Sequence, residues 1–318
     1  LFFFNNNLKK FGTYIVIILV VNGGIGSQLF QYAAAYELSK KNNSKIYLDL
    51  SFINSQKSIP SRPDLAPNLY KLDKVMNVSD CKVIKNIWIS RLLRIYFRIL
   101  HLITLGKLNY KRIDIKNPFE FSEFPIAKNY FINGYPNNLS YVEKYMDEFL
   151  SKFITIKYNP ETSINDLKKI KIGIHVRKED LANTSVDICD KDYYSRSIKE
   201  IYKMKNLTSK EVEFLIFCQE KEWPKKNINL EGAKVKYFIG NHNDAVEDFK
   251  EMYNCDHLIM PNSGFSWWAA QKIMNTKSKA LIMCPDLWWD KIDINQINIY
   301  PNNWKIMKTG VNARVYNS

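Results

Sequence analysis

Strand-like and helix-like segments alternate through the second half of this chain, and that alternation restricts its fold more than any other feature. Short apolar, β-prone runs predict strands at residues 171–176, 213–218, 235–238, 257–260 and 280–284. Helical spacing of apolar residues predicts helices at residues 192–204, 244–253 and 265–274. Strands that alternate with helices of about 10–15 residues indicate a mostly parallel α/β sheet.

The first half opens with the same kind of unit. An apolar run at residues 14–21 leads into a glycine-rich turn at residues 22–28. A helical pattern follows at residues 29–41, and a second strand is predicted at residues 44–50. This order of strand, glycine turn, helix and strand is typical of a Rossmann-type domain.

A dinucleotide-binding fingerprint is incomplete at this turn. It would need a third glycine where Leu29 stands, although Asp49 has the position of a ribose-binding acid. Glycines here still allow a close approach of ligand and backbone at the start of the helix. A tight turn without a ligand is the alternative.

The domain organisation follows from a break at residues 159–162, where proline interrupts the pattern. We predict an α/β fold of two Rossmann-like domains that face a central cleft. The predicted segments are a poorly ordered leader at residues 1–13, an N-terminal domain at 14–160, a C-terminal domain at 161–300 and a tail at 301–318.

One apolar segment, residues 87–105, has the pattern of an amphipathic basic helix, with Arg91, Arg94 and Arg98 on one side. Such a helix can lie on an anionic membrane or pack within the protein, and we favour packing. The apolar run at residues 14–21 is far shorter than the about 20 residues that a membrane span needs. It is therefore predicted as a buried strand.

Charge and cysteine content narrow the function classes. The net charge of +14 and the pI near 9.3 suit an anionic partner, such as nucleic acid, a phosphorylated donor or an acidic membrane. A bias in gene composition is the alternative explanation. The five cysteines are scattered and never form C-x-x-C, which fits a reducing compartment and predicts neither a disulfide framework nor a zinc site.

Charged side chains end the strand predicted at residues 171–176. Ligands bind at the carboxyl ends of strands in open α/β sheets. Alternation along the strand puts His175 and Arg177 on one face and Lys178 on the other. Arg177 offers two parallel donors for phosphate oxygens, and Asp180 either orients it or accepts from a substrate hydroxyl. An ordinary salt-bridged strand end is the alternative.

A small polar turn follows the strand predicted at residues 257–260. It consists of Asn262, Ser263, Gly264, Phe265 and Ser266. Free N–H groups at the start of the next helix can bind a diphosphate without a metal. Trp267 and Trp268 are predicted to belong to the core.

Three acidic residues are candidate binding groups. Asp248, on a predicted helix, can accept from N1–H and N2–H of guanine together, and a solvent-facing helical acid is the alternative. Asp190 and Asp192 have the D-x-D spacing of metal and sugar-nucleotide sites. One of them is predicted to cap a helix, and no metal is predicted.

Three segments, in order, resemble the α-1,2-fucosyltransferase family. Residues 23–33 (G-G-I-G-S-Q-L-F-Q-Y-A) are similar to its G-G-L-G-N-Q-x-F-Q-Y-A signature. Residues 175–180 (H-V-R-K-E-D) resemble H-x-R-R-G-D, and residues 262–270 (N-S-G-F-S-W-W-A-A) resemble N-S-[ST]-[FY]-S-W-W-A-A. The match extends from about residue 18 to residue 289.

The resemblance implies a GT-B-like enzyme that moves L-fucose from GDP-β-L-fucose to the 2-hydroxyl of a terminal galactose, with inversion and with neither a cofactor nor a metal. The implied catalytic residues are Arg177, Asp180 and His175. The implied donor-binding residues are His175, Arg177, Asp248, Asn262, Ser263, Phe265 and Ser266. The implied acceptor-side residues are Gly24, Gly26, Ser27 and Gln28.

The acceptor implied is a galactose-terminated oligosaccharide of surface polysaccharide or O-antigen synthesis, lipid-linked as one option. A cytoplasmic location is expected, with peripheral contact at the inner face of the plasma membrane as an alternative. No nucleic-acid partner is expected, because the basic residues are dispersed.

Three departures from the family pattern leave alternatives open. Ser27 replaces Asn, Lys178 replaces Arg and Glu179 replaces Gly. The alternatives are a transferase with another donor or acceptor sugar and an inactive relative that binds a sugar nucleotide. A nicotinamide-dependent oxidoreductase would explain the first βαβ unit, but the missing third glycine speaks against it.

Overall fold

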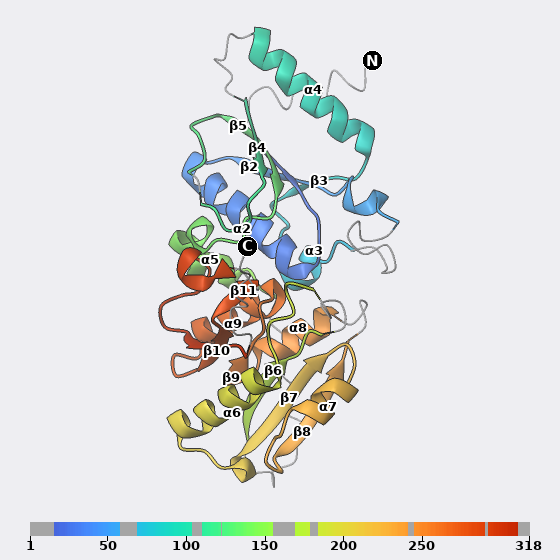
Figure 1. Cartoon of the computed structure of the whole chain (residues 1–318). Coiled ribbons are helices and arrows are strands. Elements are labelled where there is room, and N and C mark those ends of the chain that lie inside the picture. Colours follow the sequence, from blue (N-terminus) through green and yellow to red (C-terminus); the bar gives the residue numbers. More distant parts are fainter. Residues whose placement is uncertain are drawn as a thin grey trace, which may run out of the picture. The chain divides into compact units, whose positions relative to one another are not determined.

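The computed structural model describes residues 16–57, 69–103, 110–121, 123–154, 169–178, 184–240, 245–289 and 292–310. The chain divides into two compact units, Leu1–Phe153 (unit 1) and Ile154–Ser318 (unit 2). Figure 1 shows a β-sheet with helices packed against it in each unit. The predicted α/β class with two Rossmann-like units is confirmed. The predicted leader and the predicted boundary at residue 160 lie outside the described residues.

Unit 1 is built on a five-stranded parallel sheet with the order β3-β2-β1-β5-β4. Its strands are β1 (Val16–Val20), β2 (Lys45–Asp49), β3 (Lys82–Ile84), β4 (Tyr110–Ile115) and β5 (Asn129–Gly134). Its helices are α2 (Ile25–Asn42), α3 (Leu72–Val75), α4 (Ile87–Ile103) and α5 (Met146–Ser151). All five residues of β1 are buried, as expected of a parallel strand covered on both faces.

Unit 2 contains a six-stranded parallel sheet with the order β13-β10-β9-β6-β7-β8. Its strands are β6 (Ile170–His175), β7 (Val212–Cys218), β8 (Lys234–Ile239), β9 (His257–Ile259), β10 (Ile282–Pro285) and β13 (Lys305–Met307). Its helices are α6 (Lys191–Lys205), α7 (Glu222–Asn227), α8 (Ala245–Tyr253) and α9 (Gly264–Thr276). A two-stranded antiparallel pair joins β11 (Leu287–Trp289) to β12 (Ile292–Asp293).

The prediction that the C-terminal domain ends at residue 300 is wrong. Ile306, in β13, pairs with Cys284 of β10 and so extends the sheet of unit 2. The three residues of β13 are exposed or half-buried, as befits an edge strand. Three residues of this composition do not predict a strand by themselves, because strand formation here depends on pairing with β10.

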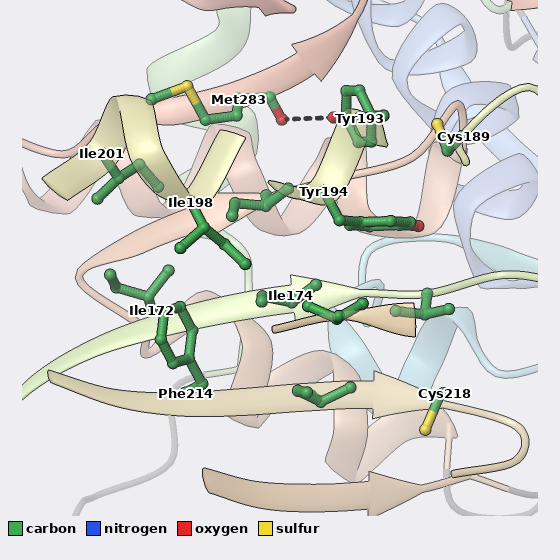
Figure 2. Close-up of a cluster of buried hydrophobic side chains, with 14 of the residues drawn as sticks. Ile172, Ile174, Cys189, Tyr193, Tyr194, Ile198, Ile201, Phe214, Cys218 and Met283 are labelled. Atoms are coloured by element: carbon green, nitrogen blue, oxygen red, sulfur yellow. Dashed lines mark hydrogen bonds between the residues drawn. The ribbon is translucent and has the colours of Figure 1, made fainter. Parts of the chain in front are cut away.

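The two faces of β6 carry different neighbours. Figure 2 shows Ile172 and Ile174 packed beneath Tyr194 and Ile198 of α6. On the opposite face Gly173 allows a close approach, because a Cβ there would lie 3.0 Å from the Cys255 sulfur. Side chains of β6 that alternate with Ile172 and Ile174 therefore face the α8–α9 side.

Strand order reverses beside the first strand of each sheet. β1 lies between β2 and β5, and β6 lies between β7 and β9. Connections leave in opposite directions at such a point, and a crevice opens outside the carboxyl ends of the two strands. The polar motifs of the sequence fall at these two places.

Candidate functional site

His175 is the last residue of β6 and is held from three directions. Its carbonyl accepts from the Tyr194 hydroxyl at 3.1 Å. Its Nδ1 lies 2.9 Å from the Ser266 hydroxyl oxygen. Its ring packs against the Phe265 ring, with centroids 5.5 Å apart. The strand and the start of α9 thus fix the imidazole at the carboxyl edge of the sheet, as strand alternation predicts.

The turn between β9 and α9 is shaped by its own backbone. The Ser263 amide donates to the Pro261 carbonyl at 2.8 Å, and the Trp267 amide donates to the Ser263 carbonyl at 3.0 Å. The Ser263 side chain makes no cap to α9, and the Ser266 hydroxyl lies 3.3 Å from the Ser263 carbonyl. The first amides of a helix have no partner within the helix. The turn can therefore offer N–H groups and the helix dipole to an anion.

Asn262 holds this turn in place. Its side-chain amide donates to the carbonyls of Val186 at 3.0 Å and Trp288 at 2.6 Å, and its oxygen lies 4.0 Å from the Cys189 sulfur. The residue is buried. The side-chain amide therefore positions the turn, and the donor-binding role implied by the resemblance stays a prediction.

The cations that follow β6 differ in their surroundings. Arg177 is half-buried. The Lys178 ammonium is 2.6 Å from a carboxylate oxygen of Asp187 and 4.8 Å from the centre of the Trp223 ring. Trp223 in turn packs on Tyr194, which places Lys178 on the α6 side of the sheet, opposite to His175. Asp180, predicted as catalytic, lies outside the described residues.

Asp248 lies at the same edge of the sheet, next to the end of β8. A Cβ on Gly240 would meet a carboxylate oxygen of Asp248 at 2.2 Å, so a larger residue there would make this carboxylate move. The neighbouring Phe249 packs on Phe265, with ring centroids 5.3 Å apart. β6 and β8 are two strand spacings apart, roughly 10 Å. The site thus extends along the sheet edge from α9 to Asp248.

Two tryptophans and one aspartate of unit 2 have structural roles. Trp267 and Trp268 are fully buried, as predicted. Asp190 accepts from the Tyr193 amide at 2.8 Å and caps α6, which confirms the predicted cap. Among the described residues, no group of three or more His, Cys, Asp and Glu side chains could hold a metal ion.

Burial keeps His257, in the sheet of unit 2, uncharged. His257 begins β9, and burial lowers its pKa to about 4. The neutral ring accepts from the Leu281 amide through Nδ1 at 2.9 Å. The neutral ring therefore joins the start of β9 to the residue that precedes β10.

In unit 1 a polar network surrounds the glycine turn. The Asn22 side chain donates to the Tyr135 hydroxyl at 2.8 Å. The Asn22 backbone N–H donates to the Gln31 side-chain oxygen at 3.0 Å. The Gln31 side chain then donates to the Gly134 carbonyl at 3.0 Å. Gly23 has φ +77°, a conformation that favours glycine. The carboxyl ends of β1 and β5 are thereby joined.

The predicted acceptor-side residues have unequal roles. Gly24 is exposed at the start of α2, Gly26 is buried and Ser27 is half-buried beside Gly23. Gln28 is fully buried. Its side chain donates to the carbonyls of Gly23 and Leu69, each at 2.8 Å, and accepts from the amides of Lys71 at 3.0 Å and Leu72 at 3.1 Å. Its amide is fully used, so Gln28 holds the turn and has no capacity left for an acceptor sugar.

Asp49, which has the position of a ribose-binding acid, is also used within the protein. It is buried, accepts from the Ser51 hydroxyl at 2.6 Å and bonds to the Ser90 hydroxyl at the start of α4. A buried carboxylate engaged in this way has a structural role, because it holds the start of α4 against the end of β2. This finding adds to the case against a nicotinamide enzyme.

Sequence reasoning missed Gly240 and the network of Asn22 and Tyr135. Gly240 directly follows a strand, and a small residue in that position is a signal for a close approach. Asn22 and Tyr135 are separated by 113 residues. Only the pairing of β1 with β5 brings them together.

Sequence comparison finds a known family over almost all of the described chain. The sequence model described as "Glycosyl transferase family 11" matches residues 16–308. The chain is 23% identical to an alpha-1,2-colitosyltransferase of Escherichia coli, over 91% of this chain and 98% of that protein. It is 24% identical to the O-antigen biosynthesis glycosyltransferase WbnK of Escherichia coli, over 85% and 93%. It is 21% identical to the bovine galactoside alpha-(1,2)-fucosyltransferase 2, over 78% and 66%.

Similar solved structures include NodZ alpha-1,6-fucosyltransferase soaked with GDP-fucose, with a TM-score of 0.47 and 14% identity over 81% of this chain and 92% of that one. The Escherichia coli heptosyltransferase WaaC with ADP has a TM-score of 0.41 and 12% identity, over 92% and 93%.

Proposed function

The chain belongs to glycosyl transferase family 11, and on that premise we propose that it transfers L-fucose from GDP-β-L-fucose to the 2-hydroxyl of a terminal galactose, with inversion at the anomeric carbon. The acceptor is an oligosaccharide of surface polysaccharide or O-antigen synthesis. Unit 2 binds the donor and the glycine turn of unit 1 faces the acceptor.

The contact between His175 and Ser266 carries the proposal. The two residues are separated by 91 positions and meet where the strand order of unit 2 reverses. The first amides of α9 and the Ser263 hydroxyl lie at the same edge. Such an edge suits a diphosphate. The spacing from β6 to Asp248 suits a nucleoside that extends along the sheet.

Catalysis rests mainly on the leaving group. As the bond between the anomeric carbon and the diphosphate oxygen breaks, its electron pair moves onto GDP. Arg177 and the N–H groups at the start of α9 stabilise that charge, and fixed donors of this kind are most effective where charge develops. The acceptor oxygen forms the new bond from the opposite face and releases its proton. Asp180 is the proposed base, and Glu179 is the alternative.

The guanine assignment predicts that GDP stabilises the protein more than UDP, ADP or CDP does. At 100 times its dissociation constant, a ligand adds about 2.7 kcal/mol to the free energy of unfolding. Thermal-shift titration measures this difference. Gly240→Ala should reduce the preference for GDP, because the new Cβ would displace the Asp248 carboxylate.

Asp248→Asn is the matched variant, since it keeps the shape and removes the acceptor pair for guanine. It should also lose the preference for GDP while the shift with UDP stays unchanged. Equal shifts with GDP and UDP in the unaltered protein would rule out the assignment of Asp248.

Transfer is expected to proceed without a divalent metal. Arg177 and the helix start supply the positive field that a metal would otherwise supply. Initial rates with EDTA should therefore equal those without it. A loss of activity that Mn²⁺ or Mg²⁺ restores would contradict this proposal and would direct attention to Asp192, which is exposed beside the capping Asp190.

A second candidate is α-1,2 transfer of colitose, the sugar named for one of the relatives. Colitose is L-fucose without its 3-hydroxyl. A site that hydrogen-bonds this hydroxyl would reject colitose by a large factor, because the polar groups would be left unpaired. Comparing kcat/KM for the two nucleotide sugars decides between the candidates.

A further inference from the structure

α4 presents apolar side chains on two faces. Leu93 and Phe97 are buried in the core of unit 1, and Ser90 is buried beside them. The sequence-based preference for packing is therefore confirmed for this inner face. Figure 1 shows α4, in teal, at one end of unit 1.

The outer face of α4 is an exposed apolar stripe. It consists of Trp88, Leu92, Ile95, Ile99 and Leu102, and all five are exposed. Successive members are four, three, four and three residues apart, which places them on one side of a helix. Trp88 is 65% exposed and Leu102 is 71% exposed. Contiguous apolar surface of this kind marks an interaction site rather than ordinary scatter.

Positive charge accompanies the stripe. Arg91 and Arg98 are exposed, and at 100° per residue they lie along one edge of the stripe. From residue 82 to residue 113 the sequence contains no Asp or Glu. It contains eight cations there, namely Lys82, Lys85, Arg91, Arg94, Arg98, Lys107, Lys111 and Arg112.

We propose that the outer face of α4 docks on an anionic lipid bilayer. The stripe would enter the boundary between headgroups and acyl chains, while Arg91 and Arg98 reach the lipid phosphates. An apolar face edged by basic residues is the pattern of helices that lie in the plane of a membrane. Among the described residues, none of the helices has the length and apolarity to cross a membrane.

The charge pattern favours a bilayer over a second copy of this chain. Two α4 helices packed through their stripes would bring the arginines of both copies together. No acidic residue of α4 could pair with them. An anionic surface instead attracts the exposed Arg91 and Arg98, at about 1 kcal/mol for each basic residue near it.

Co-sedimentation with vesicles tests the proposal. The full-length protein is expected to pellet with vesicles of mixed phosphatidylcholine and phosphatidylglycerol, and to be released by salt. It should stay in solution with phosphatidylcholine alone. Arg91→Gln combined with Arg98→Gln should weaken binding about 30-fold, which corresponds to about 1 kcal/mol for each residue. Leu92→Ser, Ile95→Ser and Ile99→Ser together should weaken it at least as much.

A matched control removes three exposed apolar side chains elsewhere. Met204→Ser, Val235→Ser and Ile306→Ser together alter unit 2 and should leave binding unchanged. Circular dichroism and melting check that each variant is folded. Binding of the α4 triple variant at the level of the unaltered protein would overturn the proposal. So would a dimer, seen by analytical ultracentrifugation, that this variant abolishes. None of these readouts depends on which sugar is transferred.

Discussion

Replacing Arg177 with alanine should lower kcat by about 10²–10³, the usual loss when one preorganised donor to a developing negative charge is removed. Arg177 follows β6 by two residues, at the edge where His175 meets Ser266. A guanidinium there can form two parallel hydrogen bonds to phosphate oxygens, and these strengthen as charge moves onto the leaving nucleotide. Steady-state transfer rates measure the loss, with circular dichroism and melting as controls for folding.

Two variants make the expectation specific. Arg177→Lys should recover only part of the rate, because it restores the charge without the planar pair of donors. Lys178→Ala should lower kcat much less, since Lys178 is engaged by Asp187 and Trp223 on the opposite side of the sheet. A larger loss of kcat in Lys178→Ala than in Arg177→Ala would contradict the assignment.

Gln28→Ala should lower the free energy of unfolding by at least about 4 kcal/mol, because four backbone groups lose their partner at about 1 kcal/mol or more each. These groups are the carbonyls of Gly23 and Leu69 and the amides of Lys71 and Leu72. Alanine can neither donate nor accept there, and the site is buried. Urea unfolding followed by fluorescence measures the change.

Graded variants separate the hydrogen bonds from the space that the side chain fills. Gln28→Glu fills the same space and keeps the two accepting contacts, but it turns a carboxylate oxygen toward the carbonyls of Gly23 and Leu69 in a buried site. It should therefore destabilise the protein at least as much as Gln28→Ala does. Ser27→Ala, at a half-buried position on the same helix turn, should change stability by less than about 0.5 kcal/mol. Equal effects of Gln28→Ala and Ser27→Ala would show that the four hydrogen bonds of the Gln28 side chain contribute nothing to stability.

Local patterns predicted the positions of His175 and Lys178 because side chains alternate strictly along a strand. The α/β class followed from the same kind of regularity. The roles of Gln28 and Asn262 could not be predicted in this way. A motif shows where a loop lies in the sequence. It does not show that the Gln28 side chain contacts Leu69, or that the Asn262 side chain contacts Trp288, because only the fold brings these residues together.

Three of the strands that sequence analysis missed share a physical reason. β3, β4 and β13 are edge or near-edge strands with charged residues among the apolar ones, and most of their side chains are exposed or half-buried. Strand formation there depends on a neighbouring strand rather than on local preference. The alternation of central strands, buried on both faces, gives a stronger signal.

The central place of β6 affects how the protein is made. β6 is the first strand of unit 2 to leave the ribosome, yet β9, its partner at the site, follows only after two further strands. Ser266 is synthesised 91 residues after His175, which takes roughly 5–20 s at about 5–20 residues per second. During that interval one edge of β6 has no partner strand, and an open apolar edge invites pairing with other chains. Unit 2 should therefore need a chaperone most while this segment is being translated, and slower translation between β7 and β9 should lower the yield of folded protein.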